Sequence, residues 1–168
     1  MSYLRTQRNT GAFQTAAYSA AMLSFWINFL DAPNDIDQAV AIRMRRQDII
    51  RRGGKRFVVL IEEQALRTWF GDADIQADQL RHLLAVTSLS NVSFGIIPLM
   101  TERVAVGSAG FWIFDDNLVA LETPTASIEV NRPDEIGLYA HMFEALKVPA
   151  VYGSTARKLI TQVIDELP

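Results

Sequence analysis

The stretch Arg43-Met44-Arg45-Arg46-Gln47 decides how this chain can fold, because it places charge inside an apolar pattern. It lies within residues 35–52, where apolar residues recur at the three- and four-residue spacing of an amphipathic helix. On a helical wheel the apolar face comprises Ile36, Ala39, Val40, Ile42, Ile49 and Ile50, and Arg43, Arg46 and Gln47 fall on that same face. The opposite face carries Arg45, Asp48 and Arg52. We therefore predict that two guanidinium groups and one amide point toward the interior, where each needs a polar partner because an unpaired buried charge is costly.

The segment before this helix, residues 11–30, contains no charged residue. Such a run is typical of a membrane span or a signal peptide, but polar residues from Gln14 to Asn28 are spread through what would be its apolar centre. We predict a buried helix instead, ended by Pro33-Asn34, with the aromatic residues Phe25, Trp26 and Phe29 in the core.

The chain after the arginine helix alternates short strands with helices. Strands are predicted over residues 56–61 and 92–97, a hairpin over 111–114 and 118–122, and a candidate further strand over 126–130. Helices are predicted over 64–70, 75–87, 133–146 and 154–167, and residues 100–110 are predicted to be a mobile connection of the kind that covers pockets. This order predicts one α+β domain over residues 1–168, with a small, mostly antiparallel sheet packed with N-terminal and C-terminal helices.

Charge and composition narrow the classes of function. The 168 residues carry a formal net charge of −3, which argues against bulk nucleic-acid binding. Seven of the 16 Lys and Arg lie between Arg43 and Arg56 against a single acid, so this basic band either meets an acidic partner or phosphate, or is a solvated helix end. The chain has no cysteine, which excludes disulfides and thiolate chemistry and favours a cytoplasmic location.

Two carboxylates at predicted strand ends, Glu63 and Glu122, are positioned to meet the inward arginines. A buried bidentate pair of Arg43 or Arg46 with one of them has two interpretations. It is either an internal network that joins helix to sheet, or the polar floor of a pocket for a small molecule or a partner's terminus. The candidate ligand-binding residues are Gln14, Tyr18, Arg43, Arg46, Gln47, Glu63, Phe111, Trp112 and Glu122.

Other chemistry has little support in the sequence. His82 and His141 lie on separate predicted helices with no acid or second histidine at ligand spacing, so no metal site is predicted. No phosphate-binding glycine motif is present, no cofactor is expected, and no residue can be assigned as catalytic.

Several of these pieces together resemble the DUF5753 domain, the C-terminal portion of many actinobacterial helix-turn-helix regulators of the Scr1 and WhiJ type. Thr10-Gly11-Ala12-Phe13-Gln14-Thr15-Ala16-Ala17-Tyr18 is similar to the family's opening Pro-Gly-Leu-Leu-Gln-Thr-x-x-Tyr signature, with Thr10 in place of proline. The family's Arg-x-x-Arg-Gln corresponds to Arg43 to Gln47, and its Asp-Glu-x-x-Leu corresponds to Glu62-Glu63-Gln64-Ala65-Leu66. Gln79-Leu80, the strand ending in Ile97-Pro98 and the strand ending in Glu122 follow in the family's order.

The resemblance implies a regulatory module that binds a small DUF397-type protein in a toxin–antitoxin-like arrangement. The family's helix-turn-helix normally precedes this domain, yet only the nine residues before Thr10 precede the signature here. We therefore expect either a fragment or a free-standing copy that does not read DNA by itself, since no remaining element carries a basic recognition helix.

Three hypotheses follow from the sequence. The first is a non-catalytic regulatory module that binds a small protein partner or a metabolite. The second is a cofactor-independent enzyme, a cyclase or isomerase acting on an apolar natural-product intermediate in the same pocket. The third is a homodimerisation domain whose apolar first helix is the interface. An enzyme should show a closed cavity, a partner-binding module an exposed apolar surface, and a dimeriser a first helix buried between two copies.

Overall fold

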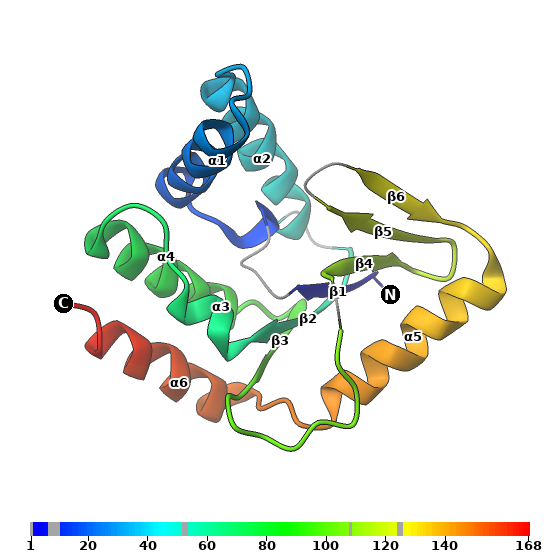
Figure 1. The fold of residues 1–168 in the computed structure, drawn as a ribbon. Helices are drawn as coiled ribbons and strands as arrows, with labels where there is room; N and C mark the ends of the chain where they lie inside the picture. Colours follow the sequence, from blue (N-terminus) through cyan, green and yellow to red (C-terminus); the bar gives the residue numbers. More distant parts are fainter. Residues whose placement is uncertain (1, 7–10, 52–53, 108, 124–125) are drawn as a thin grey trace.

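The computed structural model describes residues 2–6, 11–51, 54–107, 109–123 and 126–168, and it confirms an α+β architecture (Figure 1). The strands are β1 (Ser2–Thr6), β2 (Phe57–Glu62), β3 (Val92–Ile97), β4 (Phe111–Phe114), β5 (Leu118–Glu122) and β6 (Ser127–Val130). The helices are η1 (Gly11–Phe13), α1 (Ala16–Leu30), α2 (Ile36–Arg51), α3 (Glu63–Arg67), α4 (Ala73–Val86), α5 (Pro133–Lys147) and α6 (Gly153–Asp165).

The six strands form one sheet in the order β3-β2-β1-β4-β5-β6. β1 pairs in parallel with β2 and antiparallel with β4, so it joins a parallel half of the sheet to an antiparallel half. The sequence did not predict β1, because a five-residue segment carries too little periodicity to be recognised before its two neighbours are known. The other strands were predicted to within one residue.

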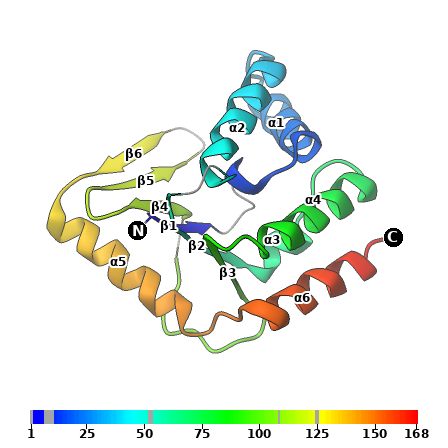
Figure 2. The same ribbon diagram turned by 180° about the vertical axis from the view of Figure 1, so that it is seen from behind.

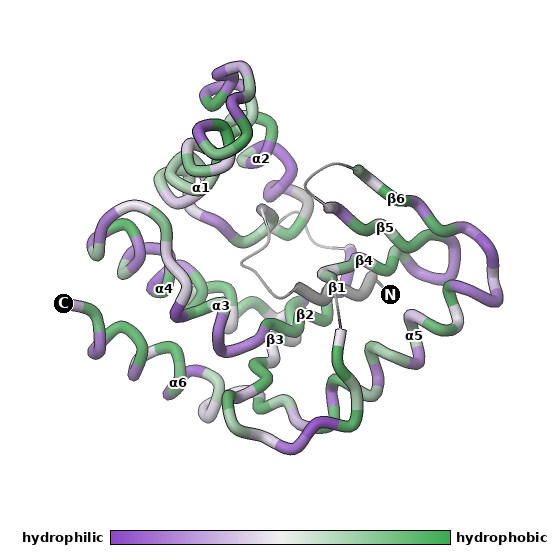
Figure 3. The backbone as a smooth tube through the Cα atoms, in the orientation of Figure 1, coloured by the Kyte–Doolittle hydropathy of each residue, from purple (hydrophilic) through white to green (hydrophobic). Residues whose placement is uncertain are grey.

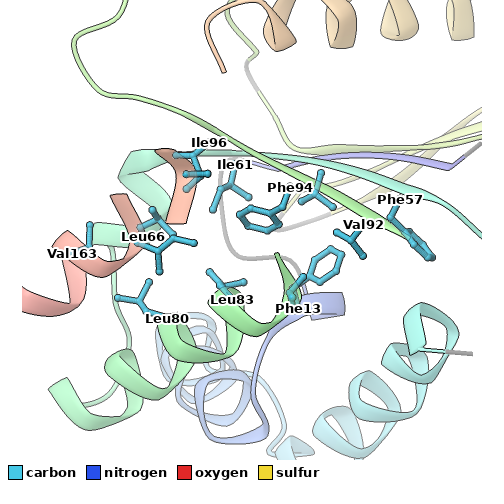
Figure 4. Close-up of a cluster of buried hydrophobic side chains, with 14 of the residues drawn as sticks. Phe13, Phe57, Ile61, Leu66, Leu80, Leu83, Val92, Phe94, Ile96 and Val163 are labelled. Carbon is cyan, nitrogen blue, oxygen red and sulfur yellow. The ribbon is translucent and has the colours of Figure 1, made fainter. Parts of the chain in front are cut away.

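One face of the sheet carries the larger core, shown in Figure 4. Alternate residues of β2 and β3, such as Val59 and Phe94, point to this face, as the two-residue period of a strand requires. The 3₁₀ helix η1 contributes Phe13, α4 contributes Leu80 and Leu83, and α6 contributes Ile160 and Val163. Phe13 meets the ring of Phe94 edge to face, with the ring centres 6.4 Å apart, so η1 is held directly against the sheet.

The opposite face is covered by α5, which lies along the antiparallel half of the sheet (Figure 2). Phe111 of β4 packs edge to face against Tyr139 and Phe143 of α5, with ring centres 5.1 and 6.4 Å away. On this face the ring of Tyr152 lies over Gly95, where a Cβ atom would come within 2.6 Å of it. A glycine is therefore required at residue 95 by close packing.

Helices α1 and α2 form a hairpin that projects from the body of the molecule (Figure 1). The turn that joins them, at the top of Figure 3, is hydrophilic. Only Tyr18, Ser19 and Met22 of α1 are buried. The prediction that α1 is buried along its whole length, with Phe25 and Phe29 in the core, is therefore wrong, because the second half of the helix extends beyond the elements that could cover it.

The face of α2 that was predicted to point inward is correct in its centre and wrong along one edge. Ile50 is buried and Gln47 half-buried, but Ile42 and Arg46, which lie four residues apart on one edge of the predicted face, are exposed. The part of the α2 surface that η1 and α1 cover is narrower than the apolar face predicted from the sequence. Arg45 and Asp48 are exposed as predicted, whereas Arg52 and the side chain of Ile49 lie outside the described part of the chain.

The uncharged character of α1 does not make it a membrane span. Across the described residues, none of the helices combines the length and the apolar character needed to cross a bilayer.

Candidate functional site

The nine candidate ligand-binding residues do not come together in one pocket. Gln14, Arg43 and Gln47 meet at the base of the hairpin, and Glu63 lies at the other end of the parallel half of the sheet. The remaining members are Tyr18 and Phe111, which belong to separate parts of the core, Trp112, which is half-buried, and Arg46 and Glu122, which are exposed.

Gln14 is the centre of the group at the hairpin base. Its side chain is fully buried, and its Oε1 atom accepts hydrogen bonds from Arg43 Nη1 and from Ser19 Oγ, both at 3.0 Å. Its Nε2 atom donates to the sulfur of Met22 at 3.5 Å. The inward guanidinium of Arg43 is thus paired with a neutral amide, not with the carboxylate that the sequence suggested.

Two further glutamines hold the backbone on either side of Gln14. Gln47 Nε2 donates to the carbonyl oxygens of Gly11 and Gln14, at 3.0 and 2.5 Å. Gln79 of α4, fully buried, donates from Nε2 to the carbonyl of Phe13 at 2.8 Å and accepts from the amide of Thr15 at 2.7 Å. We call Gln14, Arg43, Gln47 and Gln79 the polar clasp, because they fix residues 11–15 between α2 and α4.

From the sequence, Gln79 was recognised only as part of a family pattern, and its hydrogen bonds to the backbone of Phe13 and Thr15 were not predicted. The signal was available, since a glutamine among the buried positions of an amphipathic helix must satisfy its amide internally. Thr15 Oγ1 also accepts the backbone N–H of Tyr18 at 3.2 Å and caps α1. The opening signature from Gly11 to Tyr18 is therefore a docking segment for the rest of the fold.

The electrostatics of Arg43 reflect partial burial. Burial lowers the pKa of the Arg43 guanidinium; the negative charge of Glu122 offsets part of this effect, and the positive charge of Arg46 adds to it. Glu122 is close enough to α2 to act through space, although its side chain is exposed at the end of β5. The stem of Arg43 lies against Gly11, whose added Cβ would meet Arg43 Cδ at 3.5 Å.

Glu63 pairs with neither Arg43 nor Arg46, so that prediction is wrong. Its Oε1 accepts from Arg67, one turn later in the same short helix, with Arg67 Nη2 at 2.8 Å. Its Oε2 accepts the backbone N–H of Leu99 at 2.9 Å. Glu63 begins the five-residue helix α3, and Arg67 lies four residues later on the same side of that helix. Side chains at this spacing are neighbours, so Glu63 pairs with Arg67 and not with an arginine of α2.

The neighbouring Glu62 forms a bidentate pair with Arg103, with N–O distances of 2.7 and 3.1 Å. Together with the bond from Leu99 to Glu63, this pair fastens the predicted lid segment, residues 100–110, to the end of β2. The side chains of Arg103 and Glu62 are 29% and 14% exposed, and the pair is bidentate, so the contact is stronger than a fully exposed ion pair. The sequence missed this pair because its partners are 41 residues apart.

The three aromatic candidates lie in three different environments. Tyr18 is buried, donates to the carbonyl of Thr68 at 3.3 Å and meets Phe70 edge to face. Phe111 and Trp112 are consecutive residues of a strand and therefore point to opposite faces of the sheet. Trp112 borders the larger core and stacks on the exposed ring of Phe114 at 6.0 Å, so the predicted pocket wall of Phe111 with Trp112 does not form.

Two hollows in the described surface are open to solvent. One, of about 230 Å³, lies between η1, α2 and α4 and is lined by Ala12, Phe13, Gln47, Ile50, His82, Ala85, Val86 and Leu89. The other, of about 530 Å³, lies along the exposed side of α6. Among the predicted site residues only Gln47 borders either of them, and within the described residues there is no cluster of three or more potential metal ligands.

A group of exposed apolar side chains on α1 and in the link between α3 and α4 was not predicted as a site. Phe25, Phe29 and Leu30 of α1 are 48%, 70% and 48% exposed, and Trp69, in the link between α3 and α4, is 40% exposed. Phe25 stacks on Phe29 with the ring centres 6.1 Å apart and the planes 6° from parallel, and it also contacts Phe70 at 5.4 Å. We call Phe25, Phe29, Leu30 and Trp69 the aromatic surface.

Comparison with known proteins identifies the family but gives no described relative. No curated protein and no solved structure matches the chain. A family model described as a domain of unknown function, DUF5753, matches residues 5–162, which is nearly the whole length. That range contains the whole polar clasp, both strand-end carboxylates and the aromatic surface. The chain therefore belongs to the DUF5753 family.

Proposed function

We propose that this chain is a non-catalytic regulatory module that acts by binding a small protein partner. The observation that carries the proposal is the aromatic surface on the projecting hairpin. Single exposed apolar residues are ordinary on proteins, whereas a continuous exposed group of aromatic rings marks an interaction site.

Phe25 and Phe29, the two rings of this surface that α1 carries, are linked to each other and to the neighbouring rings of Trp26 and Phe70. Phe25 contacts Trp26, Phe29 and Phe70 with centre distances between 5.4 and 6.1 Å, so a partner would meet one pre-ordered patch. Aromatic side chains are the commonest anchors of protein interfaces because they bury a large area at a small cost in conformational entropy. The second half of α1 thus has the composition of an interface and the exposure of a free surface.

The predicted polar pocket supports binding chemistry less well. The clasp amides hydrogen-bond to the protein's own backbone and side chains, and Glu62 and Glu63 are engaged with Arg103 and Arg67. An acid–base role would require groups that face a substrate cavity, and the two described hollows contain none of these four charged residues. These two hollows therefore give the enzymatic alternative no support.

The family resemblance supplies the kind of partner. DUF5753 modules are expected to act with a small DUF397-type protein, while a separate helix-turn-helix reads DNA. In this proposal the chain supplies the partner-binding part of such a regulator, and binding a partner on the projecting hairpin would leave the sheet and α6 unchanged.

Native mass spectrometry of the tagged chain, recovered from its own host, tests this proposal. A stoichiometric small protein that dissociates only on activation in the instrument would support it. A bound metabolite in place of a protein would overturn it in favour of a sensor or enzyme. A bare monomer or a bare homodimer would also overturn it.

A further inference from the structure

We infer that the aromatic surface receives a cationic amphipathic helix of the partner protein, with an apolar ridge flanked by Lys or Arg. This inference rests on the proposed function and specifies which segment of a partner the site would take. It follows from the charges around the aromatic surface, from the absence of free backbone groups on the side of a helix, and from the position of the hairpin.

Every charged residue in the segments that carry the aromatic surface is an aspartate. Residues 11–42, which contain α1, the turn and the first part of α2, include Asp31, Asp35 and Asp37 and no Lys, Arg or Glu. Residues 68–80, which contain Trp69, include Asp72, Asp74 and Asp78 and again no basic residue. Arg43 to Arg56, the basic band of the sequence, begin only where α2 returns toward the sheet.

These acids border the aromatic rings in space as well as in sequence. Asp31 directly follows Leu30 at the end of α1, Asp35 lies in the connection to α2, and Asp37 lies in the first turn of α2; all three are exposed. On the other side the start of α4 touches α1, since a Cβ added to Gly71 would lie 3.2 Å from that of Ala21. Exposed Asp72 and Asp74 follow Gly71, so apolar rings lie between two acidic borders.

The acidic borders decide between two occupants. In a symmetric homodimer this surface would meet its own copy, which would bring like charges together without compensation. A partner with basic residues on both sides of an apolar ridge would pair with both borders. The acidic borders also imply that ionic strength affects binding, because exposed charge pairs are screened over about 8 Å at physiological salt.

The shape of the surface selects a helix over a strand. Phe25 and Phe29 lie one turn apart on a helix whose backbone hydrogen bonds are internal, so no main-chain groups are available for an added strand. A partner must therefore bind through side chains. A helix laid along α1 presents them at the three- and four-residue spacing that fits between rows of rings.

The test uses two fluorescent 18-residue peptides with the same leucine ridge, one with lysines on both flanks and one with glutamates. Binding to the whole chain is measured by fluorescence anisotropy in low and physiological salt. We expect the lysine peptide to bind at least about tenfold more tightly than the glutamate peptide, with the difference reduced by salt. Equal binding of both peptides would overturn the inference.

Two matched variants of the protein separate this site from general attraction. Phe29→Asp removes a ring and adds an acid, so it should weaken the lysine peptide at least about tenfold although the surface becomes more negative. Leu138→Asp makes the same change on α5, at a side chain that is 68% exposed, and should alter affinity less than about twofold. Equal losses in both variants, or none in Phe29→Asp, would overturn the inference. Circular dichroism checks folding, and Leu30→Asp repeats the test if Phe29→Asp is unfolded.

The native mass spectrum of the same variants distinguishes the two levels of proposal. If a small protein co-purifies with the wild-type chain and is lost only from Phe29→Asp, both stand. If it co-purifies equally with Phe29→Asp, the proposed function stands and this docking site is wrong. If nothing co-purifies with the wild-type chain, the proposed function itself is wrong. A wild-type homodimer that Phe29→Asp dissociates would assign the surface to a second copy and overturn the inference.

Discussion

The two ends of the α1–α2 hairpin differ in what they bury. At the base, the side chains of Gln14 and Gln79 are fully buried and the guanidinium of Arg43 is half-buried. At the projecting end, Phe29 is 70% exposed and Leu30 is 48% exposed. Polar groups thus lie inside at the base of the hairpin and apolar groups lie outside at its projecting end, the reverse of the usual distribution.

The difference shows that a side chain of the hairpin is buried where other elements cover it and supply its contacts. At the base each buried polar atom in the clasp has a hydrogen-bond partner at 2.5 to 3.5 Å, so the cost of removing it from water is offset. At the projecting end the helix extends past the body of the protein, where Phe25 contacts Phe29 and Phe70 and Trp26 contacts Phe29. The polar groups at the base find their partners within this chain, while we propose that the aromatic surface binds another molecule.

The largest effect is expected at the base from Gln79→Leu. This change leaves the amide of Thr15 and the carbonyl of Phe13 buried without their partner and should lower the free energy of unfolding by about 3–4 kcal/mol. Urea denaturation followed by circular dichroism measures it. A loss below about 1 kcal/mol would show that η1 and α1 are not held by α4.

Gln14→Leu should cost somewhat less, about 2–3 kcal/mol. It removes the acceptor shared by Arg43 and Ser19, but the half-buried guanidinium can turn toward water and recover part of the loss. The matched comparison is the double variant Gln14→Leu with Arg43→Met. Removing both partners should recover stability relative to Gln14→Leu alone, and a purely additive loss would indicate that Arg43 and Gln14 do not interact.

Arg43→Ala should cost about 1–2 kcal/mol, because Gln14 Oε1 keeps its bond from Ser19. The effect is smaller than expected for stranding a buried carboxylate, since the partner is an amide. Arg46→Ala, on the exposed edge of the same helix, should change stability by less than about 0.5 kcal/mol. Equal losses in these two variants, measured in the same denaturation assay, would mean that Arg43 does not lie on the inward face of α2.

The smallest effect on stability is expected at the projecting end. Phe29→Ser should change the free energy of unfolding by less than about 0.5 kcal/mol, because its ring is mostly in water. Matched denaturation curves of the wild type and the variant measure this. A loss comparable to that of Gln14→Leu would show that the aromatic rings are part of the core and would remove the contrast between the two ends.

The elements with strong local periodicity were predictable, and the contacts across the fold were not. The bounds of α2, β3 and the hairpin of β4 with β5 follow from apolar spacing and turn residues. The same spacing does not predict that Glu63 pairs within its own helix or that Arg46 is exposed. Which carboxylate an arginine meets depends on the distance between elements, and a sequence pattern carries no such distance.

The sequence by itself determined the α+β class, the amphipathic arginine helix and membership of the DUF5753 family, because local periodicity and ordered motifs are properties of the chain. The tertiary structure decided that β1 occupies the centre of the sheet, that three glutamines and Arg43 fasten residues 11–15, and that the aromatic rings of α1 face water. An apolar residue is buried only where another element covers it, and that depends on where α1 extends relative to the body, not on its own composition.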